Sequence, residues 1–283
     1  MTTTICICGA GTMGSGIAQM VAQRGFATIL FDINEKVLHE AVMNIQKNLQ
    51  YLVDKKRILP EEKKLIFNRI QFTSEITDCK ASVIIEAIIE KEEAKVSLFK
   101  ELETYNDQKV IFASNTSSLS VSSIQEKINF SKRVVGMHFF NPAYIMKLVE
   151  VVKGNQTSDT VAKFIFELCK QMGKVPVMCK DAPGFIVNRV ARHYYLESLK
   201  IVEEQISSLE DVDEILEASG FKMGPFKLMD LIGLDINLTV TERLYQSFNH
   251  AERFAPSSLQ VNKVNNKELG KKSGKGFYNY PDK

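Results

Sequence analysis

A histidine and a carboxylate that could do acid–base chemistry stand twelve residues apart in this chain. His138 lies near the end of the apolar run Val134–Phe139, and Asn141-Pro142 follows at once. Glu150 lies inside a second apolar run, Leu148–Lys153. An imidazole with a pKa of about 6.5 suits removal of an alcohol proton during hydride transfer, and a carboxylate would hold its tautomer. A carboxylate in a buried strand needs a partner, so Glu150 read alone could also be a paired structural residue.

The other histidines are weaker candidates for chemistry. His39 and His250 stand among polar residues, as solvated surface histidines do. His193 lies in a long helical stretch beside Arg192 and Tyr194, where packing or an interface explains it. We therefore take His138 as the candidate base.

The cysteines favour no metal site. Cys6 and Cys8 stand two apart in a predicted strand and share a face, which is not a CxxC pair. Cys79, Cys169 and Cys179 are scattered and have no histidine at metal-ligand spacing. We expect buried or semi-buried thiols in a reducing compartment, and no metal.

A glycine-rich segment near the start matches GxGxxG, a pattern that is weak alone. It reads Gly9-Ala10-Gly11-Thr12-Met13-Gly14, follows a predicted strand and opens a predicted helix. The glycines would allow a tight turn, approach of the backbone to a pyrophosphate, and close packing of the helix on the sheet. The pyrophosphate would lie at the helix N-terminus, which favours anions. Asp32 ends the second predicted strand, where a carboxylate binds a ribose 2′-hydroxyl and repels the 2′-phosphate of NADP, so the pattern predicts NAD.

Strands and helices alternate through the first two thirds of the chain. The apolar strand candidates lack strict alternation, which suits strands buried on both faces of a mostly parallel sheet. These strands are Thr4–Cys8, Thr28–Asp32, Arg69–Phe72, Val83–Ala87, Val110–Ser114, Val134–Phe139, Leu148–Val152 and Val175–Cys179. The clearest helices between them are Met13–Arg24, Glu35–Lys56, Glu92–Thr104 and Asp159–Met172. The alternation predicts a Rossmann-like, doubly wound α/β domain.

The pattern changes near Pro183-Gly184. A long helix, Ile186–Gln205, follows, and the remaining segments are helical and broken at glycines and prolines. We predict a dinucleotide-binding domain over residues 1–183 and an all-α domain over 184–283.

Composition excludes several classes of protein. Hydrophobic residues make up 45% and charged residues 25%, which is too apolar for disorder. The net charge of +2 gives no global attraction to nucleic acid or to a membrane surface. No apolar run approaches the roughly 18 residues needed to span a bilayer. We expect a cytoplasmic protein without nucleic-acid or membrane partners.

With these motifs the chain resembles the L-3-hydroxyacyl-CoA dehydrogenase family, in its short bacterial 3-hydroxybutyryl-CoA form. Motifs that carry the resemblance run nearly end to end. They are Gly9–Ala18, Glu86–Glu90, Ser114–Ser118, Gly136–Pro142, Lys147–Val152, Asp181–Arg189, Gly224–Asp235 and Gly270–Tyr278. The resemblance implies oxidation of an acyl-CoA substrate by NAD and a homodimer formed through the helical domain.

The resemblance also assigns roles to single residues. It implies that His138 is the general base, that Glu150 completes the dyad, and that Ser117 and Asn188 bind the 3-oxygen of the substrate. The residues that would line the nicotinamide half of the NAD site are Glu90, Lys95, Asn141 and Lys272. From the residues themselves, Ser117 follows a strand at the same sheet edge as His138, but a turn or cap would explain it equally well, and Asn188 alone is uninformative.

The connection Glu35–Asn68 is longer than an ordinary crossover helix. A break near Leu59-Pro60 predicts two antiparallel helices that project from the sheet. Lys55 and Lys56 lie near the tip of this helical hairpin insertion. A solvated, charge-balanced face is the plain explanation, and contact with the phosphates of CoA is the functional one implied by the resemblance.

The sequence departs from the family's usual motifs at two positions, and two alternative functions remain open. The family's usual NPAP and PMGP runs would place a proline near Tyr144 in addition to Pro142, and another near Lys222 in addition to Pro225. This chain lacks both of these further prolines, which bears on acyl-chain preference. One alternative is a Rossmann dehydrogenase of a hydroxy acid or sugar acid without CoA, an enzyme that commonly uses a lysine base. The other is a nucleotide-binding protein that has lost turnover.

Overall fold

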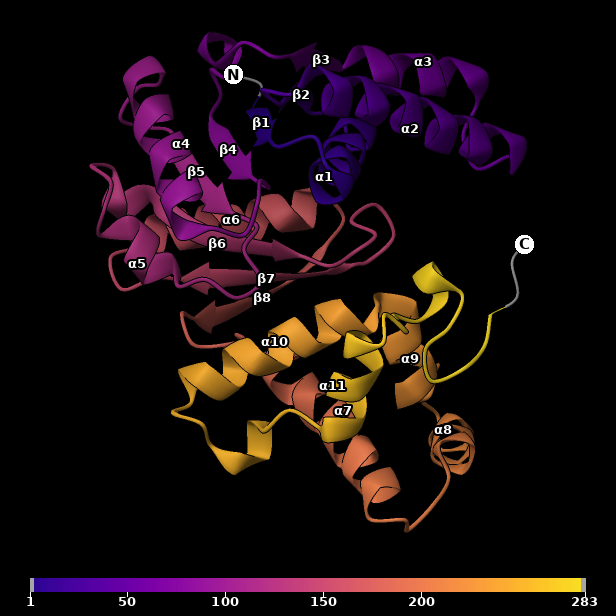
Figure 1. The fold of residues 1–283 in the computed structure, drawn as a ribbon. Helices are drawn as coiled ribbons and strands as arrows, with labels where there is room; N and C mark the ends of the chain where they lie inside the picture. Colours follow the sequence, from indigo (N-terminus) through magenta and orange to yellow (C-terminus); the bar gives the residue numbers. More distant parts are fainter. Residues whose placement is uncertain (1–2, 281–283) are drawn as a thin grey trace. The chain divides into compact units, whose positions relative to one another are not determined.

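The computed structural model describes residues 3–280. The chain divides into two compact units, Met1–Ala182 and Pro183–Lys283 (Figure 1).

The first unit is built on one eight-stranded sheet with the order β3-β2-β1-β4-β5-β6-β7-β8. All neighbouring strands are parallel except β6 and β7, which are antiparallel. The strands are β1 Thr4–Cys8, β2 Ala27–Phe31, β3 Ile70–Thr73, β4 Val83–Glu86, β5 Ile111–Ser114, β6 Val134–Phe139, β7 Leu148–Lys153 and β8 Val175–Lys180. The predicted doubly wound, mostly parallel sheet is confirmed, with strand ends shifted by at most one residue.

The strand order reverses direction at β1, which pairs with β2 on one side and with β4 on the other. In an open α/β sheet, a crevice forms beyond the carboxyl ends of the strands at such a point. Cys8, the last residue of β1, leads directly into Gly9 at that edge. The topology therefore places the glycine-rich segment where a dinucleotide can bind.

Helices cover the sheet because their apolar faces must be buried. They are α1 Thr12–Gln23, α2 Glu35–Asp54, α3 Pro60–Asn68, α4 Glu92–Tyr105, α5 Val121–Gln125 and α6 Asp159–Gln171, with short 3₁₀ turns η1 Ile76–Asp78 and η2 Ser131–Arg133. The core on the α1 side of the sheet includes Ile5 and Ile7, both fully buried. Local caps fix the ends: the side chain of Asn34 accepts from the backbone of α2, and Gly173, with a φ of 72°, follows α6. Helix α5 is a single short turn that the sequence pattern did not reveal.

Helices α2 and α3 form the predicted hairpin and pack against each other (Figure 1). Pro60 stands at the first turn of α3, where its missing N–H costs nothing. The carboxylate of Glu62 accepts from the backbone N–H of Leu59 at 2.7 Å. Lys55 caps the end of α2 and Lys56 adopts a φ of 54°, so both lysines lie in the turn between the helices.

The second unit is helical, as predicted. Its helices are α7 Val187–Glu203, α8 Leu209–Ala218, α9 Pro225–Ile232, α10 Leu234–Ser247 and α11 Ser258–Asn265, with 3₁₀ turns η3 Glu252–Phe254 and η4 Lys271–Ser273. Two buried carboxylates organise it. Asp213 accepts from the backbone of Phe226 and from the hydroxyl of Tyr278, and Asp230 accepts from the backbone of Phe277 and Tyr278. Over residues 3–280, no helix is both long and apolar enough to cross a bilayer.

Candidate active site

His138 and Glu150 are cross-strand neighbours in the antiparallel ladder of β6 and β7. Side chains at directly opposed positions lie on the same face of the sheet and within reach of each other. Nδ1 of His138 lies 2.7 Å from Oε2 of Glu150, and the two residues are only 6% and 1% exposed. The partner that a buried carboxylate requires is therefore the candidate base.

The contact fixes the chemistry of the imidazole ring. A carboxylate accepts hydrogen bonds, so Nδ1 carries the hydrogen and Nε2 becomes the basic nitrogen. The ring also packs on Phe140, with centroids 4.5 Å apart. The backbone N–H of Phe139 donates to Oδ1 of Asn115 at 2.9 Å, which ties the end of β6 to the segment after β5. The imidazole is thus held in tautomer and in position.

A second buried network lies at the ends of β4 and β5. Nζ of Lys95, on α4, lies 2.5 Å from Oε1 of Glu86 and 3.1 Å from Oε2 of Glu90. Lys95 is 1% exposed and Glu86 is fully buried. Oε1 of Glu90 accepts from the hydroxyl of Thr116, from the backbone N–H of Ser117 at 3.1 Å and from the hydroxyl of Ser118. Glu90 therefore holds the Ser117 segment in place, and Lys95 holds Glu90.

Burial and neighbouring positive charge have opposite effects on the pKa values of Glu86 and Glu90. Burial raises the pKa of Glu86, and this effect outweighs the positive charge of Lys95 and the donors around it. Burial also opposes ionisation of Glu90, but Lys95 and the hydroxyl donors prevail and hold the pKa of Glu90 below its ordinary value. Of Glu86 and Glu90, Glu90 is therefore the carboxyl group that ionises more readily.

The glycine-rich segment has the geometry that close approach requires. A Cβ on Gly14 would lie 1.7 Å from the carbonyl oxygen of Gly9, so no side chain fits there. A Cβ on Gly11 would meet nothing within 4 Å, and Gly11 caps α1 without any side-chain hydrogen bond. The start of α1 therefore has open space at Gly11 and no side chain that caps it, as a pyrophosphate site demands.

Asp32 has a second contact that sequence reasoning missed. Its Oδ2 accepts from the backbone N–H of Ala10 at 2.7 Å, and its Oδ1 accepts from that of Asn34 at 2.9 Å. The carboxylate thus braces the glycine-rich segment against the end of β2. Each oxygen has a further lone pair with which to accept from a ribose hydroxyl.

A surface pocket of about 410 Å³ joins several predicted cofactor residues. Gly11 and Thr12 line it from the glycine-rich segment, Asn141 and Tyr144 from the segment after β6, and Asn48 from α2. Met13, also in the motif, packs against the hydrophobic core instead.

Two predicted site residues belong to the second unit. Asn188 is in the first turn of α7. Lys272 lies in η4, and its Nζ is 2.5 Å from Oδ1 of Asp235.

Sequence reasoning missed two residues that support the site. Asn115 could have been found, because it stands in the Ser114–Ser118 motif directly after a strand. Lys174 gave no signal: its buried ammonium donates to the carbonyls of Ala143 and Met146, a contact made only by tertiary packing. Burial and the charge of Arg24 lower the pKa of Lys174 to about 8.

Comparison with known families matches both units. Residues 4–182 match the family model of the 3-hydroxyacyl-CoA dehydrogenase NAD binding domain, and residues 184–280 match that of its C-terminal domain. The chain belongs to the 3-hydroxyacyl-CoA dehydrogenase family. The predicted resemblance, the predicted dehydrogenase activity class and the predicted NAD cofactor are thereby confirmed.

Known relatives match this dehydrogenase over nearly its whole length. It is 40% identical to 3-hydroxyadipyl-CoA dehydrogenase of Escherichia coli K12 over 98% of this chain, and it spans 59% of that longer protein. It is 38% identical to a probable 3-hydroxybutyryl-CoA dehydrogenase of Bacillus subtilis, over 99% of this chain and 98% of the relative. The crystal structure of (S)-3-hydroxybutyryl-CoA dehydrogenase from Ralstonia eutropha superimposes with a TM-score of 0.95 at 36% identity and full coverage of both chains.

Proposed function

We propose that this dehydrogenase oxidises short-chain L-3-hydroxyacyl-CoA, with 3-hydroxybutyryl-CoA as substrate, to 3-ketoacyl-CoA, and reduces it in reverse. The observation that carries the proposal is the buried His138–Glu150 pair beside the carboxyl edge of the sheet. A base and a carboxylate held 2.7 Å apart are what an alcohol oxidation needs in addition to a hydride acceptor. The Bacillus and Ralstonia relatives carry the name of this activity.

The residues present fit the cofactor. Gly11, the uncapped start of α1 and Asp32 supply open amides and a carboxylate at the positions that a dinucleotide uses. When bound, NAD supplies the nicotinamide carbon that accepts the hydride. Gly9, Gly11, Thr12, Gly14 and Asp32 would hold it, together with Met13 through packing of α1.

His138 carries the proton in this scheme. Nε2 takes the proton of the substrate hydroxyl as the hydride leaves C3, and the imidazolium that forms is stabilised by Glu150. In the reverse direction the imidazolium returns the proton to the forming alkoxide. Acid–base help of this kind contributes roughly 10²–10⁴-fold to the rate.

Ser117 and Asn188 complete the proposed catalytic set by hydrogen bonding to the 3-oxygen of the substrate. The bond from the backbone of Ser117 to Glu90 supports this role because it fixes the segment that carries the serine hydroxyl. Glu90, Asn141 and Lys272 are proposed for the nicotinamide half of the NAD site. Lys95, which is buried, would act there through Glu90.

The two ends of the substrate are assigned to different elements. Lys55 and Lys56, in the turn of the α2–α3 hairpin, are proposed to bind phosphates of CoA.

The NAD-binding domain comprises residues 1–183, and residues 184–283 supply the substrate cleft and the dimer interface. The second unit carries large exposed apolar side chains of the kind that a partner subunit could cover; they include Val190, Ile215, Phe221 and Ile236. A cytoplasmic homodimer with a role in fatty acid and butanoate metabolism is consistent with this assignment.

The decisive experiment is a spectrophotometric assay of NADH loss with acetoacetyl-CoA. We expect turnover by the purified chain and almost none by His138→Ala. Comparing acetoacetyl-CoA with a long-chain 3-ketoacyl-CoA gives the chain-length preference, and light scattering after size exclusion gives the oligomeric state. Turnover of a free 3-hydroxy acid or sugar acid, with none of the CoA ester, would show that the non-CoA alternative is correct.

A further inference from the structure

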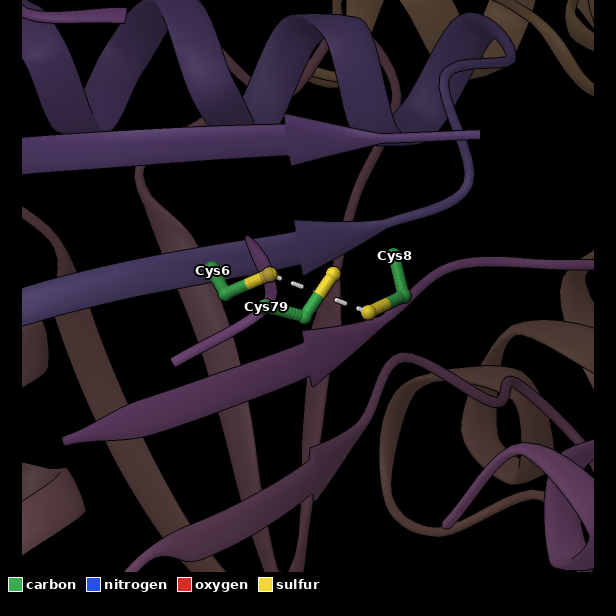
Figure 2. Close-up of side chains that lie close together, drawn as sticks. All are labelled: Cys6, Cys8 and Cys79. Carbon is green, nitrogen blue, oxygen red and sulfur yellow. Dashed lines mark hydrogen bonds between the residues drawn. The ribbon is translucent and has the colours of Figure 1, made fainter. Parts of the chain in front are cut away.

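Three cysteine side chains that lie far apart in the sequence converge inside the first unit. Cys6 and Cys8 extend from β1, and Cys79 extends from the segment between η1 and β4 (Figure 2). The three Sγ atoms lie within 4.8 Å of one another, and those of Cys6 and Cys8 are 3.8 Å apart. The expectation that Cys79 stands apart from the others is therefore wrong. The reason is tertiary: Cys79 stands shortly before β4, which pairs with β1.

Strand geometry and one hydrogen bond place the three thiols on the same side of β1. Cys6 and Cys8 alternate with Ile5 and Ile7, which belong to the core on the α1 side, so both thiols point to the opposite face of β1. The carbonyl of Cys79 accepts from Nδ2 of Asn106 at 2.9 Å, which anchors the third thiol. All three residues are 0% exposed, and none forms a disulfide.

The spacing of the sulfurs suits a metal ion bound by three thiolates. An ion at the centre of a triangle with sides between 3.8 and 4.8 Å lies about 2.2–2.8 Å from each sulfur, and metal–thiolate bonds are about 2.3 Å long. Three thiolates in a dry interior select soft ions.

A set of three ligands, without a fourth, favours Cu(I) over zinc among the soft ions. Structural zinc takes four ligands in a tetrahedron. Over residues 3–280, no fourth cysteine, histidine or carboxylate lies close enough to join the three cysteines. Cu(I), the other soft ion that thiolates select, does not require a tetrahedron of protein ligands.

A surface pocket lies beside the segment that carries Cys79. A surface pocket of about 840 Å³ at the opposite edge of the sheet from the glycine-rich segment is lined by Asp78 and Lys80, the two neighbours of Cys79. A local displacement of Cys79 and Lys80, which follow the last residue of η1 and precede β4, would open the thiols to an ion or to its carrier.

We propose that Cys6, Cys8 and Cys79 form a trithiolate site for a soft monovalent metal ion, Cu(I). The site is distinct from the hydride-transfer chemistry, and the proposal opposes the sequence-based prediction of no metal.

The test uses a full-length variant in which the three cysteines are the only thiols. The chain has five cysteines, so Cys169→Ala with Cys179→Ala leaves the cluster alone. This parent variant is reduced, kept anaerobic and titrated with Cu(I) in competition with a chromogenic Cu(I) chelator. We expect one Cu(I) per chain to be withheld from the chelator, with a sulfur-only shell by X-ray absorption.

Removing one ligand provides the matched comparison. Cys79→Ala in the parent should lose the competing site, whereas the parent already controls for loss of a fully buried thiol at Cys169. If Cys79→Ala does not fold, Cys6→Val, which suits a buried strand, removes a different ligand. The proposal fails if the parent withholds no Cu(I) from the chelator, or if a folded variant lacking Cys79 or Cys6 withholds as much as the parent.

Discussion

Glu150 lies directly opposite His138 across β6 and β7, with Oε2 2.7 Å from Nδ1 in a setting from which solvent is nearly absent. In such a setting neither residue can replace its partner with water. Removing one leaves the other with an unmet hydrogen-bonding requirement. The two side chains should therefore behave as one functional unit.

Mutations of this pair should be far from additive. We expect His138→Ala to lower kcat by roughly 10²–10³-fold with little change in NAD affinity. Glu150→Gln should produce a large part of the same loss, because the imidazolium loses its negative partner. The double variant should resemble His138→Ala in steady-state kinetics with acetoacetyl-CoA. Losses that simply multiply would refute the dyad.

Asp32 should set the choice between NAD and NADP. The wild-type chain should favour NAD by orders of magnitude in kcat/KM, because the carboxylate repels a 2′-phosphate. Asp32→Asn keeps an oxygen that can accept from the N–H of Ala10 but removes the charge, so it should narrow the preference while the loop stays braced. Kinetics with both cofactors measure this, and comparable wild-type rates with NAD and NADP would contradict it.

Charge reversal at the hairpin turn should weaken binding of the CoA moiety. Lys55→Glu with Lys56→Glu should raise KM for acetoacetyl-CoA several-fold, mostly at low ionic strength, because exposed charges are screened by salt. The N-acetylcysteamine thioester lacks the phosphates and should be turned over equally by both proteins. Lys100→Glu with Lys163→Glu makes the same charge change on exposed parts of α4 and α6 and serves as the control. Equal harm to the full and the truncated substrate would remove the hairpin from the CoA site.

Glu90 should make the first unit sensitive to acid. Its pKa is lowered in the folded chain, so below its ordinary value of 4.5 the unfolded state binds a proton that the folded state does not. The stability contributed by Glu90 is therefore present above that value and is lost as the pH falls through the lowered pKa.

Comparing wild type with Glu90→Gln tests this effect. Urea unfolding should show the wild type more stable at neutral pH, with a difference that shrinks on acidification. Glu40→Gln, at an exposed position of α2, should show no such trend. A difference that grows in acid would contradict the expected sign.

The parts of the fold that could be predicted depend on local patterns. The strand Thr4–Cys8 is a short apolar run, and the glycines after it require special backbone geometry, so both are visible in a few adjacent residues. The connection between β6 and β7 is too short for a parallel crossover, so the two strands are expected to pair in an antiparallel way. That pairing places Glu150 across from His138. The His138–Glu150 contact was accordingly within reach of the sequence.

Other features depend on contacts that no local pattern encodes. Cys79 reaches Cys6 and Cys8 because β4, which begins shortly after it, pairs with β1. The bond between Asp32 and the amide of Ala10 is formed by two loops that meet at the sheet edge, and periodicity describes neither loop. Placement of Lys95 between two carboxylates likewise requires α4 to pack on β4.

The burial of Lys95 gives the protein a built-in reporter. An amine at 1% exposure, bonded to Glu86 and Glu90, cannot be reached by an acylating reagent while the unit is closed. Exposed lysines such as Lys100 would be labelled first, whereas labelling of Lys95 must wait for the end of β4 and the start of α4 to separate. The rate at which a mass spectrometer detects modified Lys95 would then report local opening between the end of β4 and the start of α4, without any change to the sequence.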